Sequence, residues 1–153
     1  MNQKPGLEKL KVFLDASCWV AAAGSSTGGS ALILELARHG FIHIIAIKRV
    51  LQEAERNIKD KLGKEALLRY YEGLGTIEID LVDPPTPEEE ARWRHLVAEK
   101  DCHILAGAYG GLADVLVSLD RRHILTRTVK EGFPLPVKDT SSFLRELPYF
   151  SGQ

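Results

Sequence analysis

Four acidic residues far apart in the chain have the types and positions to do chemistry together, namely Asp15, Glu53, Asp101 and Asp120. Asp15 and Asp120 close apolar runs that we expect to be strands. Glu53 and Asp101 lie near the starts of segments with helical spacing. Strand ends and the following helix starts meet at one edge of a parallel sheet, so we expect the four carboxylates to gather there. Clustered like charges are costly unless a cation lies among them, which favours a metal site.

Carboxylates are hard oxygen ligands that suit magnesium or manganese. Such an ion can activate a water molecule and neutralise charge on a phosphate, which is the chemistry of phosphodiester hydrolysis. None of the five histidines falls at a zinc-binding spacing. Taken singly, each acid has a simpler explanation, as a cap, a turn residue, a solvated helix residue or a surface ion pair. The four together point to a site.

The segments that would position these acids alternate between short apolar runs and stretches of helical spacing. We expect strands at 11–15, 41–47, 76–82, 115–119 and within 133–138, and helices at 31–39, 48–62, 65–72, 87–99, from 101 and at 140–147. The strand at 76–82 alternates apolar and polar residues, so it is expected at a sheet edge. The alternation predicts an α/β fold, a three-layer α/β/α sandwich around a parallel sheet of four to five strands.

Helix boundaries are signalled at several positions. The small, polar stretch 24–30 lacks the lysine ending of a phosphate-binding loop and the dinucleotide glycine spacing, so we interpret it as a loop with Ser30 or a neighbour as N-cap. Thr86, Pro87 and Glu89 form a capping-box pattern. The stretch 73–75 holds two glycines and is expected to end a helix.

Composition limits the class of protein. The 153 residues are expected to form a single domain (1–153, core about 10–147). The net charge of -1 gives no global basic excess, so any nucleic-acid contact must rest on local charges. Cys18 and Cys102 are expected to be reduced. Without a membrane-length apolar run or a signal-peptide pattern, we expect a cytoplasmic protein that does not contact a membrane.

Four segments of the chain resemble the motifs of PIN-domain ribonucleases. Asp15-Ala16-Ser17 after an apolar strand is similar to the opening motif, and residues 50–57 to the second acidic motif. Residues 100–106 and 113–120 resemble the third and fourth. The match covers about residues 10–145. It implies a parallel sheet between helices and metal-dependent cleavage of single-stranded RNA, as in VapC-like toxins.

The resemblance also implies residue roles. Asp15, Glu53, Asp101 and Asp120 would be the catalytic ligands of Mg²⁺ or Mn²⁺, with Asp120 at the family's most variable position. Ser17 would hold a metal-bound water or a neighbouring carboxylate. Ser118 stands where the family often has threonine and keeps the hydroxyl. Asp114, in the approach to the strand, is a weaker candidate.

Basic residues flank the predicted site and are predicted to hold RNA phosphates: Lys48, Arg49, Arg121 and Arg122, with His123 beside them. Trp19 and Tyr109 have rings that can stack on bases, although Trp19 is expected in the core. The resemblance implies single-stranded or structured RNA as substrate, an antitoxin protein as partner and a homodimer.

Three other classes of protein share some of these features. A receiver domain needs adjacent acids after its first strand, whereas Asp15 stands alone. A haloacid-dehalogenase-like phosphatase needs a second aspartate where Ser17 stands. An inactive PIN-like module that binds RNA or protein is the remaining alternative, and retention of all four acids argues against it, because an unused cluster would only destabilise the fold.

Overall fold

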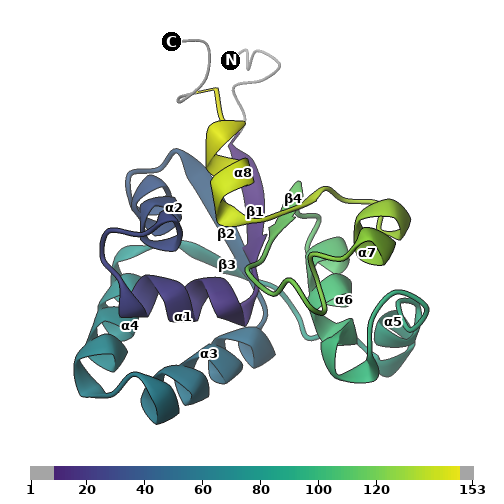
Figure 1. Cartoon of the computed structure of the whole chain (residues 1–153), viewed down its shortest axis with the longest axis horizontal. Coiled ribbons are helices and arrows are strands. Elements are labelled where there is room, and N and C mark those ends of the chain that lie inside the picture. The colour runs from purple at the N-terminus through teal and green to yellow at the C-terminus, as the bar shows by residue number, and fades with distance from the viewer. Residues whose placement is uncertain (1–8, 149–153) are drawn as a thin grey trace.

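The computed structural model describes residues 9–148, and its centre is a five-stranded parallel sheet in the order β3-β2-β1-β4-β5 (Figure 1). The strands are β1 Leu10–Leu14, β2 Ile42–Ala46, β3 Ile79–Leu81, β4 Val115–Val117 and β5 Val137–Lys138. In the central strand, Val12 pairs with Ile44 on one side and Val115 on the other. The predicted parallel sheet is confirmed, and β3 is at an edge as expected.

Helices lie on both faces of the sheet. They are α1 Ala16–Gly24, α2 Gly29–Arg38, α3 Lys48–Lys61, α4 Lys64–Thr76, α5 Pro87–Ala91, α6 Cys102–Gly110, α7 Arg127–Gly132 and α8 Thr140–Arg145, with a 3₁₀ turn η1 at Glu99–Asp101. Figure 1 shows α1 to α4 on one side of the sheet and α5 to α7 on the other. Consecutive β1 residues Val12, Phe13 and Leu14 are therefore all buried, because each face of the strand meets helices.

Several boundaries differ from those predicted. Helix α4 continues through residues 73–75 to Thr76, so the expected end there is wrong. Each glycine costs up to about 1 kcal/mol in a helix, but Ala66 and Tyr70 are buried on this helix, and tertiary packing outweighs that local preference. Gly28, not Ser30, occupies the N-cap position of α2. Helices α1 and α7 were not predicted.

The segment before the third acid is less regular than predicted. Helix α5 ends at Ala91 instead of continuing to residue 99, although the capping box of Thr86 and Glu89 at its start is confirmed. The chain then turns so that Trp93 packs edge-on against Phe133, with ring centroids 4.9 Å apart. Burial of this indole fixes the chain path into η1 and α6.

Strand β4 ends at Val117, so Asp120 lies in the turn beyond the strand and does not close it. The Ser118 amide still donates to the Lys138 carbonyl at 3.0 Å. Beyond it the Asp120 carboxylate accepts the amides of Arg122 and His123 and folds the chain into a turn. Both cysteines are free and buried. Within residues 9–148, none of the helices has the length and apolar character needed to cross a membrane.

Gly107 lets α6 lie close to the sheet. A Cβ atom at this position would come within 3.1 Å of the Phe13 ring and of the Ile47 side chain. Such a contact is tighter than most real Cβ contacts, so a residue with a side chain would force the neighbouring groups to shift. Because Asp101 stands at the start of α6, this close packing also sets the position of its carboxylate.

Gly107→Val is expected to lower the free energy of unfolding by about 1–3 kcal/mol, because overpacking a filled interior forces shifts in its neighbours. Gly110→Ala is the matched control, since a Cβ there meets nothing within 4 Å. It should be neutral or stabilise the helix by up to about 1 kcal/mol. Urea unfolding of both variants measures the difference, and equal midpoints would contradict the packing argument.

Candidate active site

The four predicted acids line one pocket of about 420 Å³ at the carboxyl edge of the sheet. Asp15 stands between β1 and α1, Glu53 on α3, Asp101 before α6 and Asp120 after β4. The remaining lining residues are Ala16, Ser17, Val20, Ala21, Asn57, Lys61 and Ile104. The structure thus brings together side chains separated by up to about a hundred positions in the sequence.

Asp15 is the most buried acid of the pocket, with 3% of its surface exposed. It caps α1 by accepting the Cys18 amide at 3.4 Å, and the hydroxyls of Ser17 and Ser118 donate to its two oxygens. Burial raises the pKa of Asp15; these hydrogen bonds oppose the shift, and the charge of Asp120 adds to it. The carboxylate is held in one orientation at a cost in stability.

The two serines also connect Asp15 to the turn after β4. Ser17 Oγ accepts the Leu119 amide at 3.0 Å, and Ser118 Oγ accepts the Asp120 amide at 2.9 Å. Each hydroxyl therefore donates to one carboxylate oxygen and accepts from the turn. This arrangement fixes the position of Asp120 relative to Asp15.

Glu53 is paired with a histidine that sequence reasoning missed. His103 Nε2 lies 2.9 Å from Glu53 Oε1, and the imidazole is 1% exposed. We assign the proton to Nε2, because an ionised carboxylate only accepts. Burial by itself would raise the pKa of Glu53, but the His103 hydrogen bond and nearby positive charges lower it below its usual value. The sequence signal for this pair is a single histidine within the otherwise apolar stretch 102–108. Such a stretch is expected to be buried, and a buried imidazole needs a polar partner.

Asp101 and Asp120 have partners of their own. Asp101 occupies the N-cap position of α6 but makes no capping hydrogen bond, and its Oδ2 lies 3.2 Å from Lys100 Nζ. Asp120 accepts the two turn amides at 3.1 and 3.0 Å and lies 3.2 Å from His123 Nδ1. The side-chain partner of Asp120 is thus His123, three residues on, and not the guanidinium group of either arginine that follows it directly.

These local partners decide how the carboxylates point. Within residues 9–148, no three His, Cys, Asp or Glu side chains lie close enough together to hold one metal ion. In this arrangement serine hydroxyls, imidazoles, a lysine and backbone amides offset the charges of the clustered acids, and a bound cation stays a prediction. The donor set of carboxylate oxygens still suits Mg²⁺ or Mn²⁺. Glu53 and Asp120 have partly exposed side chains, so their carboxylates have room to reorient.

The basic residues predicted to hold phosphates lie outside the pocket lining. Lys48 and Arg122 are exposed. Arg49 is 3.8 Å from Glu90, and Arg121 is 3.1 Å from Asp139. Their contact with RNA stays a prediction.

Asn57 and Lys61 line the acid pocket, and sequence reasoning missed both. They follow Glu53 by four and eight positions. That spacing puts all three residues on one face of a helix, which is the signal in the sequence that points to them.

Three other candidates are placed away from the acids. Trp19 is buried and packs edge-on against Tyr70, so its expected place in the core is confirmed. Tyr109 is at the far end of α6 from Asp101, with the Arg92 guanidinium 4.5 Å over its ring. Asp114 accepts the Lys11 amide at 2.8 Å, at the start of β4 and hence at the opposite edge of the sheet.

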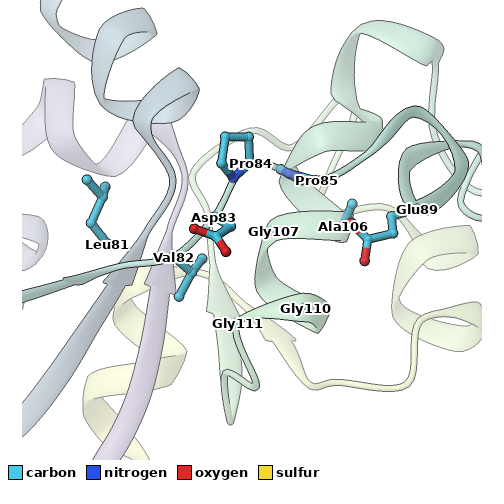
Figure 2. A pocket seen from close by; sticks show the side chains of 10 residues that line it. All are labelled: Leu81, Val82, Asp83, Pro84, Pro85, Glu89, Ala106, Gly107, Gly110 and Gly111. Carbon is cyan, nitrogen blue, oxygen red and sulfur yellow. The ribbon is translucent and has the colours of Figure 1, made fainter.

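A second pocket, of about 480 Å³, lies between the segment after β3 and helix α6 and holds none of the four acids (Figure 2). Its walls are Leu81 to Pro85, Glu89, Ala106 and the glycines of 107–111. A Cβ at Gly111 would come within 2.8 Å of Ile45, so this glycine serves close packing of the helix end on the sheet.

Comparisons with known proteins agree with this architecture. The family model described as PIN domain matches residues 11–122. The solved structure of VapC20 from Mycobacterium tuberculosis is similar, with 16% identity over 80% of this chain and 95% of that chain and a TM-score of 0.55. VapBC2 from Rickettsia felis shows 16% identity over 85% and 98%, with a TM-score of 0.63. No protein of the curated set gives a significant sequence match.

A third solved structure, PAE2754 from Pyrobaculum aerophilum, shares 17% identity over 92% of this chain and 96% of that chain, with a TM-score of 0.60. At these identities the structures establish the shared fold, whereas the family model matches the sequence itself over most of its length. The chain therefore belongs to the PIN-domain family.

Proposed function

We propose that this chain is a metal-dependent endoribonuclease that hydrolyses phosphodiester bonds in single-stranded RNA. The observation that carries the proposal is the convergence of four acids, Asp15, Glu53, Asp101 and Asp120, on one pocket of a PIN-domain fold. The similar VapC20 is described as a sarcin–ricin loop cleaving toxin, so structured RNA is also a candidate substrate.

The four carboxylates would hold a Mg²⁺ or Mn²⁺ ion. When bound, such an ion activates water and neutralises charge on the phosphate and the leaving oxygen. The chain prepares the ligands: the Ser17 and Ser118 hydroxyls hold Asp15, and His103 holds Glu53. The turn amides hold Asp120. The basic residues Lys48, Arg49, Arg121 and Arg122 would attract RNA phosphates.

Partners and compartment are part of the proposal. Similarity to VapBC2 supports a toxin that is paired with an antitoxin protein. We also propose that the chain forms a homodimer, as the resemblance to PIN-domain ribonucleases implies. The two free, buried cysteines fit a reducing cytoplasm.

One observation favours a second function. Since no three potential ligands within the described residues are close enough to hold one ion, a catalytically inactive PIN-like module that binds RNA or protein would also fit the fold. Retention of all four acids in one pocket favours the nuclease, because unused clustered carboxylates only cost stability.

Incubation of the purified chain with end-labelled single-stranded RNA tests the proposal. With Mn²⁺ or Mg²⁺ we expect shortened products, and with excess chelator we expect none. Asp101→Asn should stop cleavage, because it removes one proposed ligand from the pocket.

Asp114→Asn is the matched control, because this acid lies at the opposite sheet edge and an asparagine oxygen can still accept the Lys11 amide. It should cleave like the wild-type chain. RNA binding without cleavage would favour the inactive module, whereas a chain that neither binds nor cleaves RNA would refute both the nuclease and an RNA-binding module.

A further inference from the structure

The acid pocket continues away from the sheet along a groove between α1 and α3. Figure 1 shows these two helices side by side, both leading away from the sheet edge. The α1 wall of the pocket is apolar and formed by Val20 and Ala21. The α3 wall is formed by Glu53, Asn57 and Lys61. At 1.5 Å rise per residue, Lys61 stands about 12 Å beyond Glu53 along the helix axis.

Lys61 carries a charge that no acid of the described chain neutralises. Its side chain is exposed, and it forms no ion pair within residues 9–148. Two other basic groups near the site are paired with acids, since Lys100 lies beside Asp101 and Arg49 beside Glu90. The ammonium group therefore remains available to an anion that enters the groove.

The charge distribution of the groove suits a nucleic-acid strand. The acidic end repels a phosphate unless a cation lies between them, so a second phosphate needs a positive group farther along the groove. Lys61 supplies a compact point charge at that distance, and the Asn57 amide supplies neutral donors on the way. The apolar surface of Val20 and Ala21 can receive the face of a sugar or base.

We propose that Asn57 and Lys61 hold the RNA phosphate next to the one that is cut, so that the substrate strand runs along the groove between α1 and α3. This inference rests on the proposed ribonuclease function and names the direction in which the substrate leaves the acids. Asn57 and Lys61 act here as positioning residues.

The test measures RNA binding without cleavage. The full chain carrying Asp101→Asn is titrated with a fluorescent single-stranded RNA in Mg²⁺ over a series of salt concentrations. Adding Lys61→Gln should weaken binding and reduce the slope of log Kd against log salt by about 0.7, which corresponds to one phosphate contact on a single strand. Adding Asn57→Ala should weaken binding and leave the slope unchanged, because the amide is uncharged.

Lys59→Gln is the matched control. Lys59 lies in the same last turn of α3 but lines a different pocket, with Glu55 and Tyr71. It should change neither affinity nor slope. Equal slopes for Lys61→Gln and Lys59→Gln would overturn the inference. Tighter Mn²⁺ binding by Lys61→Gln in calorimetry, with an unchanged RNA slope, would also overturn it, because Lys61 would then only offset the acids.

The cleavage assay on the wild-type chain separates the two levels of the proposal. If the wild-type chain cleaves RNA with metal and Lys61→Gln leaves the slope of log Kd against log salt unchanged, the proposed role of the groove is refuted. The ribonuclease function is then still supported. A wild-type chain that neither binds nor cuts RNA refutes the ribonuclease function, and with it the proposal that the groove holds RNA.

Discussion

Asp15→Asn is expected to abolish RNA cleavage while raising the temperature at which the chain unfolds. The loss of activity follows from removing one proposed metal ligand at the centre of the pocket. An ion contributes several kcal/mol of transition-state stabilisation, and each 1.36 kcal/mol is tenfold in rate, so we expect a loss of about 10³-fold or more. A fluorogenic RNA substrate with Mn²⁺ measures this rate.

The gain in stability follows from the burial of the same carboxylate. Burial raises the pKa of Asp15, which means that ionising this group costs more in the folded chain than in the unfolded one. Asparagine removes the charge and remains a good N-cap for α1. Each kcal/mol gained should raise Tm by about 2–4 °C for a chain of this size.

The pH dependence has a defined sign. Because the folded pKa of Asp15 is raised, the folded chain binds the proton more tightly, and its contribution to stability is complete below the unfolded pKa. That contribution is lost as pH rises through the folded pKa. Thermal unfolding in chelator at a series of pH values should therefore show the advantage of Asp15→Asn growing with pH.

Asp114→Asn again serves as the control and should retain wild-type cleavage. A purely structural Asp15 would give a different pattern, in which asparagine leaves cleavage intact. Full activity of Asp15→Asn with Mn²⁺ would contradict the proposed role of this residue, whatever the change in Tm.

Binding of Mn²⁺ is expected to stabilise the wild-type chain strongly. An ion that binds only the folded state adds about 2.7 kcal/mol at a hundred times its Kd. For a chain of this length, that corresponds to roughly 5–10 °C in Tm. The ion would also remove the cost of the buried Asp15 charge, so its effect should be largest at neutral pH and should fade on acidification as ligands protonate.

Differential scanning fluorimetry with and without Mn²⁺ measures the shift, and chelator should reverse it. Asp15→Asn and Asp101→Asn should each lose most of the shift, whereas Asp114→Asn should keep it. An unchanged Tm for the wild-type chain at high Mn²⁺ would favour the inactive binding module, in which the carboxylates stay with the partners that the structure shows.

Local signals were sufficient for much of the fold. The apolar run before Asp15 forms β1, the periodic segment around Glu53 forms α3, and the capping box at Thr86 starts α5. These elements depend on hydrophobic periodicity and on contacts a few residues apart, which a sequence displays directly. The same signals misplace the end of α4, because buried packing of Tyr70 overrides the glycines that follow it.

The sequence by itself determined all five strands and most of the helices, with α1 and α7 as the exceptions. It also determined that four acids stand at the carboxyl edge of a parallel sheet, since alternating strands and helices leave few ways to connect. Only the tertiary structure decided what each acid touches. Glu53 meets His103 across fifty positions, and Ser118 meets Asp15 across more than a hundred. Such pairs depend on how closely the helices pack on the sheet and on which side-chain rotamers that packing allows. Local hydrophobic periodicity determines neither of them.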